Sequence, residues 1–204
     1  MQLIKYLISK ITLTLLISNS LIAQNYTQRL TNERSHKKIA LTEGNRAPLK
    51  SDELIYIRHF QPDSTWLIQG LVEFIGDTTS IPFQTSSGKI KYFEKRALIR
   101  FQRGNEEFRL TAYRNVKDRG NLESEGSLFI PFTDRSNGDS TYEGGRYINA
   151  SANDIKEGKL LVDFNRCYNP YCAYSSGFNC PVPPAENRLS IAIPVGEQAF
   201  AKPH

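Results

Sequence analysis

The chain has 204 residues, of which 39% are hydrophobic and 23% are charged, and its formal net charge is +5. This length is enough for one domain with a substantial core and short for two. The charge is too small, and too widely spread along the chain, to indicate a nucleic-acid-binding protein, so we expect no nucleic-acid partner.

The first 23 residues have the features of a secretory signal peptide. Lys5 and Lys10 precede a short apolar stretch over 11–17, and small residues place the cleavage site after Ser20 or after Ala23. The uncharged run is shorter than the roughly 20 residues that a membrane span needs. We therefore expect an exported protein, periplasmic or secreted, with no stable membrane insertion once the signal is removed.

Residues 24–47 are expected to form a helical or flexible N-terminal segment, with a short surface helix from Tyr26 to about Ala40. A second short helix is predicted from Asp52 to about His59. Ser51 is a good N-cap for it, and acidic residues in its first turn suit the helix dipole. Residues 48–200 are expected to form a single main domain.

From Trp66 onward the hydrophobic pattern changes to that of β-strands. Trp66, Ile68, Val72 and Phe74 have the same parity, which predicts a strand with one buried face. Two alternating runs meet at Gly104-Asn105, which predicts a β-hairpin.

A further strand is predicted at Leu128–Phe132, where Pro131 indicates a sheet edge or a bulge. Other short strands are expected at Tyr147–Ile148, Leu160–Phe164 and Leu189–Ile193. About eight short strands separated by turns predict an all-β domain, either a sandwich or an open barrel, with one or two short N-terminal helices.

Residues suited to common catalytic centres are scarce. The histidines are His36, His59 and His204, and none of them is close in sequence to the other polar motifs. A Ser-His-Asp triad, a Cys-His pair and a zinc site are therefore not expected. The acidic loop over 134–143 lacks EF-hand spacing, and no glycine-rich nucleotide motif occurs. We predict neither a metal nor a cofactor.

All three cysteines lie in one segment, 163–188, that is rich in proline and tyrosine. Cys167, Cys172 and Cys180 do not have the spacing of paired zinc ligands. In an exported chain the favoured interpretation is a Cys172–Cys180 disulfide, with Cys167 left as a buried small residue or a free thiol. The alternative is a catalytic thiolate, which a neighbouring arginine such as Arg166 or Arg188 would stabilise.

Arg146 follows two glycines, Gly144 and Gly145. Its guanidinium would suit the carboxylate of a ligand, or that of Asp163 or Glu186. The alternative is a buried ion pair that holds loops together. Asp163 and Glu186 are also the carboxylates within 163–188, and two carboxylates across a cleft are the minimum requirement for glycoside hydrolysis. Nearby aromatic side chains would then stack on a sugar: Tyr168, Tyr171, Tyr174 and Phe178.

Five motifs resemble those of the DUF1684 family, of which this chain would be an exported, short form. They read F-T-D-R-S-N-G (132–138), T-Y-E-G-G-R-Y (141–147), D-F-N-R (163–166), Y-N-P-Y-C-A-Y (168–174) and C-P-V-P-P-A-E-N-R-L (180–189). Glu143 and Cys167 depart from the pattern, which usually has glycine and alanine there. The resemblance implies one domain, favours the Cys172–Cys180 pair, and makes Cys167 an incidental core residue. It implies no reaction, because the family has no assigned activity.

The sequence thus predicts an exported domain that binds a small polar or anionic ligand. The predicted pocket residues are the polar side chains of the C-terminal motifs: Arg146, Asp163, Asn165, Tyr168, Asn169, Glu186 and Asn187. One alternative is a hydrolase of cell-envelope glycan that uses Asp163 and Glu186. The other is a purely structural or interaction domain.

Overall fold

The structure, a computed structural model, describes residues 24–202. The predicted signal peptide at 1–23 lies outside the described residues.

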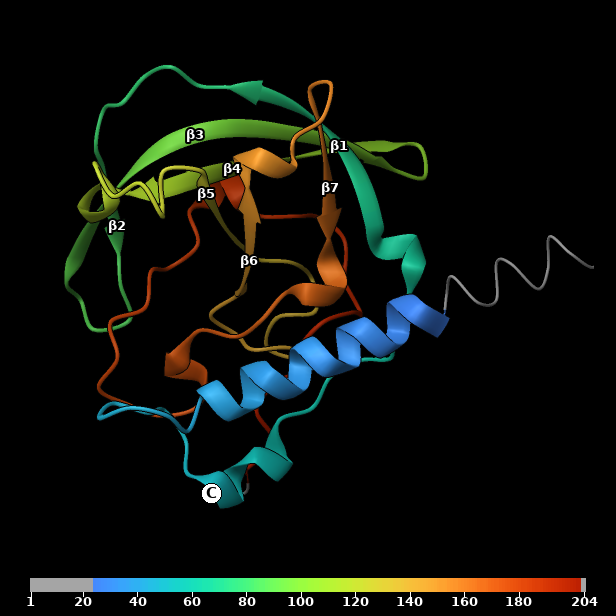
Figure 1. Ribbon diagram of the computed structural model, residues 1–204, viewed down its shortest axis with the longest axis vertical. Coiled ribbons are helices and arrows are strands. Elements are labelled where there is room, and N and C mark those ends of the chain that lie inside the picture. Colours follow the sequence, from blue (N-terminus) through green and yellow to red (C-terminus); the bar gives the residue numbers. More distant parts are fainter. Residues whose placement is uncertain (1–23, 203–204) are drawn as a thin grey trace, which may run out of the picture.

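One curled antiparallel sheet dominates the domain (Figure 1). Its strands are β1 (Leu67–Phe74), β2 (Ile81–Gln84), β3 (Ile90–Arg103), β4 (Glu106–Asn115), β5 (Ser127–Phe132), β6 (Arg146–Ser151) and β7 (Lys159–Asp163). Their order is β6-β5-β4-β3-β1-β7, and β2 pairs with β3. The predicted all-β class with an open, barrel-like sheet is confirmed.

Strand β3 is the longest strand and spans the curved part of the sheet. Its pairing with β4 shifts register between Lys95 and Ala97, and such a bulge adds bend and twist to a strand. The predicted hairpin is confirmed: Arg103 pairs with Glu106 across Gly104-Asn105. Gly104 has φ +60°, a conformation that glycine adopts without steric cost.

The N-terminal helix covers residues 24–40, in agreement with the prediction. Figure 1 shows it (blue) apart from the strands, with orange and red C-terminal segments between it and the sheet. The second predicted helix is shorter than expected, a 3-10 helix η1 (Ser51–Tyr56), because Ile57 is already extended and its side chain is buried. Within residues 24–202, no helix has the length and apolar character that a membrane crossing requires.

The other helical elements are single 3-10 turns. They are η2 (Ser64–Trp66), η3 (Val116–Asp118), η4 (Ala152–Asp154), η5 (Phe164–Arg166), η6 (Tyr171–Ala173) and η7 (Ala185–Asn187).

Three details of the strand prediction are corrected. Strand β5 is not an edge strand, because it lies between β4 and β6. Its pairing with β4 is limited to Tyr113–Phe129, so Pro131 has no ladder partner on that side to lose. The predicted strand at Leu189–Ile193 is irregular, although both end residues are buried, and β2 has no counterpart among the predicted strands.

The main core fills the concave side of the sheet. Strand residues such as Ile99, Leu110 and Phe132 pack there against Leu189, Ile193 and Val195 from the C-terminal segment. The irregular C-terminal segment thus replaces a second sheet, which explains why the fold is half a barrel rather than a sandwich.

Candidate functional site

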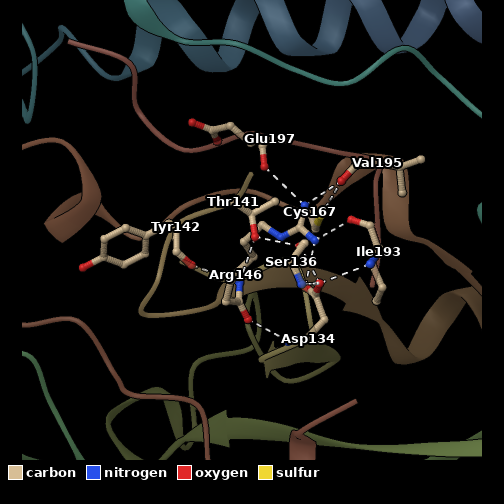
Figure 2. Close-up of polar contacts among 10 residues, drawn as sticks. Asp134, Ser136, Thr141, Tyr142, Arg146, Cys167, Ile193, Val195 and Glu197 are labelled. Atoms are coloured by element: carbon tan, nitrogen blue, oxygen red, sulfur yellow. Dashed lines mark hydrogen bonds and ion pairs between the residues drawn. The ribbon is translucent and has the colours of Figure 1, made fainter. Parts of the chain in front are cut away.

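Arg146 lies at the start of β6 and is completely buried. Its Nη1 donates to the carbonyl oxygens of Val195 (2.6 Å) and Glu197 (3.2 Å). Its Nη2 donates to the carbonyl of Ile193 (2.8 Å) and to Oδ2 of Asp134 (2.9 Å). Figure 2 shows this network, in which the guanidinium of Arg146 connects the C-terminal segment to the sheet through hydrogen bonds.

The carboxylate partner of Arg146 is therefore Asp134 rather than Asp163 or Glu186. This is the buried ion pair that the sequence offered as the alternative. Gly145 has φ +86°, and a Cβ there would lie 2.6 Å from the carbonyl oxygen of Phe132. The glycine before Arg146 thus allows the chain to enter β6 at a close backbone approach.

Asn187 is also completely buried and joins two strands. Its Oδ1 accepts from the amide of Thr111 (2.7 Å), and its Nδ2 donates to the carbonyls of Thr111 (2.8 Å) and Pro131 (2.7 Å). The carboxamide thus acts as an extra peptide group between β4 and β5, where their direct pairing is limited.

Asp163 and Glu186 belong to two separate sets of contacts. Asp163 accepts from the hydroxyl of Tyr26 (3.0 Å) and lies 3.3 Å from Nε of Arg166. Glu186 pairs with Lys95 (2.8 Å) and accepts from the hydroxyl of Tyr113. Burial acts to raise the pKa of Glu186, but its bonds from Lys95 and Tyr113 outweigh that effect and hold the pKa below its usual value.

The other three predicted ligand residues, Asn165, Tyr168 and Asn169, line one cavity of about 290 Å³ beneath the N-terminal helix. We call it the helix cavity. Its N-terminal wall includes Leu30, Arg34, Lys37, Lys38, Leu41 and His59, and its other wall includes Asn165, Arg166, Tyr168, Asn169, Tyr174 and Glu197.

The helix cavity is rich in cations, most of which already have protein partners. Arg34 donates to the carbonyls of Phe60 and Asn165, both at 3.1 Å. Lys38 donates to the carbonyl of Ile57. Lys37 differs, because its Nζ lies 5.3 Å from the centre of the Tyr168 ring and forms no hydrogen bond or ion pair within residues 24–202.

Two buried polar atoms in this cavity lack hydrogen-bond partners. Among the described side chains only three such atoms occur, and Nε of Arg34 and Oδ1 of Asn169 are two of them. Buried polar groups in native proteins are nearly always bonded to protein, water or ligand. Both residues line the cavity, so its wall contains one unbonded donor and one unbonded acceptor, with the Lys37 cation nearby.

Glu197 places a carboxylate in the same cavity. Its Oε1 accepts from the hydroxyl of Tyr174 (2.6 Å), and its Oε2 accepts from the amide of Asn169 (3.1 Å). In Figure 2 its side chain points away from Arg146, while its carbonyl oxygen receives the Arg146 bond. Burial raises the pKa of Glu197 to about 7.

Opposing pH effects are expected from Glu197 and His59. Burial, assisted by the positive charges of Arg34 and the neighbouring lysines, lowers the pKa of His59 from 6.5 to about 3. Below pH 6.5 the unfolded chain takes up a proton on His59 that the folded protein does not accept until about pH 3. The folded protein therefore loses stability as the pH falls through this range. The unfolded chain loses the Glu197 proton above the ordinary pKa of 4.5, whereas the folded protein keeps this proton up to about pH 7. The stability of the folded protein therefore falls as the pH rises from 4.5 to about 7.

We expect the substitution Glu197→Gln to remove the Glu197 effect alone. Relative to the wild type, the variant should gain about 3 kcal/mol of unfolding free energy between pH 4.5 and pH 8. The His59 contribution is present in both proteins and cancels in the difference. Urea unfolding at five pH values measures this change, and parallel pH curves for the two proteins would contradict it.

The sequence did not identify Arg34, Lys37 or Glu197 as site residues, and it indicated Tyr174 only as a sugar-stacking residue of the alternative hydrolase. A signal for the first two was present, since Leu30, Arg34, Lys37, Lys38 and Leu41 recur at helical spacing and share one face. Glu197 lies in an irregular segment, and no local sequence pattern marks it as a site residue.

A second, larger cavity of about 670 Å³ lies between the sheet and the disulfide-bonded loop. We call it the sheet cavity. Its lining includes aromatic residues and a cation from strands β3–β6 (Lys91, Phe93, Tyr113, Phe129, Tyr147) together with Tyr168, Tyr171 and Phe178. It shares Asn149, Tyr168, Asn169 and Tyr171 with the helix cavity, so the two adjoin.

A disulfide joins Cys172 and Cys180, as predicted, with a Cα–Cα distance of 6.3 Å. Cys167 is a buried free cysteine in the main core. Burial raises the pKa of its thiol, which disfavours the catalytic thiolate considered above. No cluster of three or more histidine, cysteine or acidic residues suited to a metal ion occurs in the described part of the chain.

Comparison with known proteins agrees with the motifs and the fold. A family model described as a protein of unknown function (DUF1684) matches residues 53–198. The chain belongs to this family. No curated protein matches this DUF1684 chain.

A solved structure also resembles the DUF1684 chain. It is the solution NMR structure of an uncharacterized protein from Haloarcula marismortui, with 29% identity and a TM-score of 0.66. The similarity covers 86% of this chain and 95% of that protein. Membership of the DUF1684 family therefore supplies the fold, whereas the function has to be argued from the cavities.

Proposed function

We propose that this DUF1684 protein is exported and binds a small anion in the helix cavity, an anion that also carries a hydroxyl or amino group. The observation that supports this most strongly is the pair of unbonded buried atoms, Nε of Arg34 and Oδ1 of Asn169. The first is a donor and suits an anionic oxygen, and the second is an acceptor and suits a hydroxyl or amine.

Lys37 supplies the charge for such a ligand. Its ammonium group has no ion-pair partner within residues 24–202, and it lies over the Tyr168 ring at the cavity wall. Lys37 is exposed for much of its length, but the partial burial of its side chain lowers its pKa, so the protein compensates its charge incompletely. An anion in the cavity would supply the missing compensation.

The size of the cavity restricts the ligand further. A volume of about 290 Å³ is at the lower end of the range for small-molecule sites, so a compact acid of a few carbon atoms is the class that fits. The Cys172–Cys180 disulfide is consistent with export, because such bonds persist in oxidising compartments.

Three matched compounds test the proposal: glycerate, which has both groups, propionate, which has only the carboxylate, and glycerol, which has only hydroxyls. Titration calorimetry should give the tightest binding for glycerate. The substitution Lys37→Ala should weaken glycerate binding by at least about tenfold, because a charge-assisted hydrogen bond contributes about 1.5–3 kcal/mol.

Arg29→Ala is the control, since Arg29 is an exposed cation of the same helix that does not line the cavity. It should change the affinity by less than about twofold, as expected of an exposed charge outside the site. If glycerate binds no better than glycerol, or if the two variants bind alike, the proposal is wrong and a structural role is favoured.

No observation favours the glycan hydrolase. Asp163 and Glu186 each have a cationic partner, and neither lines the helix cavity or the sheet cavity.

A further inference from the structure

A continuous row of aromatic rings crosses the sheet at the sheet cavity. Phe93 of β3 stacks on Phe129 of β5 at 5.6 Å between ring centres. Phe129 meets Tyr147 of β6 edge-to-face at 4.8 Å, and Tyr147 meets Tyr168 at 5.8 Å. These contacts fix the ring orientations, so this wall of the cavity is preformed.

The opposite wall comes from the disulfide-bonded loop. Tyr171 and Phe178 lie there in edge-to-face contact at 5.1 Å, and the guanidinium of Arg46 lies 5.8 Å from the Phe178 ring. Tyr171 is 44% exposed, so much of its ring is accessible from the cavity side or from solvent. The cavity is therefore bounded by aromatic surface on two sides.

Two tyrosine hydroxyls of the sheet wall already have hydrogen-bond partners within the protein. Tyr113 donates to Glu186, and Tyr147 donates to the carbonyl of Pro181. Tyr113 is completely buried and Tyr147 nearly so, and the accessible ring surface of this wall therefore comes mainly from Phe129 and Tyr168, which are partly exposed. Polar contacts have to come from other lining residues, among them Lys91, Asn115, Asn149 and Asn179.

Lys91 is the cation of the sheet cavity that lacks a partner. Arg114 is paired with the buried carboxylate of Glu94, and Arg46 donates to the carbonyl of Gly177. Lys91 has no ion pair among the residues the structure describes. Burial lowers the pKa of Lys91, as does the neighbouring charge of Lys117, and the lining of the cavity also contains one carboxylate, that of Asp118.

From this combination we infer that the sheet cavity is a second binding site, which takes a single ring bearing one negative charge. Two aromatic walls suit the flat face of the ring, Lys91 suits the charge, and the asparagine amides suit ring hydroxyls. An aromatic acid and an acidic sugar share this chemistry. The volume of about 670 Å³ lies within the usual range for such ligands and exceeds that of the helix cavity.

This inference does not depend on the proposed function, because it concerns other cations and another wall of the fold. The residues common to both cavities, among them Tyr168 and Asn169, place the two sites side by side.

The test uses 4-hydroxybenzoate and D-glucuronate, with D-glucose as the uncharged ring. Titration calorimetry should show binding of at least one of the two acids and much weaker binding of glucose. Whichever acid binds more tightly identifies the ring type. Lys91→Ala should weaken that binding by at least about tenfold, and Tyr171→Ala by a smaller factor through loss of one ring face.

Two controls separate this site from the helix cavity. Lys89→Ala changes an exposed lysine two residues away that does not line the cavity, and it should leave the affinity within about twofold. Lys37→Ala should weaken glycerate binding by at least about tenfold and ring binding much less, because Lys37 does not line the sheet cavity. If neither acid binds, or if Lys91→Ala binds as Lys89→Ala does, the inference is wrong. Loss of ring binding in Lys37→Ala would likewise overturn the second site, by assigning both ligands to the helix cavity.

Discussion

Replacing Arg146 by alanine is expected to lower the free energy of unfolding by about 3–5 kcal/mol. The substitution would leave the Asp134 carboxylate buried without its cation and would free three carbonyls of the C-terminal segment. Urea unfolding followed by the fluorescence of Trp66, the single tryptophan, measures the effect. A loss of this size would make Arg146 a stability residue even though it lies in a family motif.

Arg135→Ala is the matched control, because Arg135 is an exposed arginine close to the same ion pair. It should change the unfolding free energy by less than about 0.5 kcal/mol. Arg146→Lys keeps the charge but has no planar fork, so it should recover only part of the loss. Equal stabilities for Arg146→Ala and Arg135→Ala would show that the network contributes little.

The substitution Asn187→Ala should have the second largest effect, a loss of about 2–4 kcal/mol. It would leave the amide and carbonyl of Thr111 and the carbonyl of Pro131 without partners in the interior. The side chain bridges β4 and β5, so we also expect faster hydrogen exchange at the Thr111 amide. Chemical denaturation and amide exchange by NMR measure the two effects.

Asn187→Asp distinguishes the bridge from simple packing. The aspartate has nearly the same shape and still accepts from the Thr111 amide, but it has no donor for the two carbonyls. It should therefore be at least as unstable as the alanine variant. Asn153→Ala, at an exposed asparagine in η4, should be neutral. A fully stable Asn187→Asp would rule out the bridging role.

Much of the fold could be predicted because its signals are local. Alternating hydrophobic residues around Gly104-Asn105 specify a hairpin regardless of what surrounds it. The strand prediction at Leu189–Ile193 was wrong for the same reason. Apolar residues in an irregular segment can be buried just as those of a strand are, so the local pattern does not distinguish the two. Pro131 misled because the local pattern does not show that β4 and β5 pair only at Tyr113–Phe129, which leaves Pro131 no ladder bond to lose on that side.

The candidate site was harder to predict than the fold. Polar residues of the family motifs have different roles: Arg146 and Asn187 satisfy backbone groups, while Tyr168 and Asn169 line cavities. The motifs indicate that these residues matter, but they do not show whether a side chain bonds to the backbone or faces a cavity. Glu197 illustrates the limit, because only the fold brings its carboxylate next to Tyr174 and Asn169.

The helix that covers the helix cavity has an evolutionary consequence. Arg34 and Lys37 lie before residue 53, where the family match begins, whereas Asn169 and Glu197 lie within it. One wall of the cavity can therefore diverge by substitutions on a single surface helix, while the sheet and its buried arginine network stay intact. A protein built in this way can acquire a new ligand through changes on one wall of the site while the opposite wall is preserved.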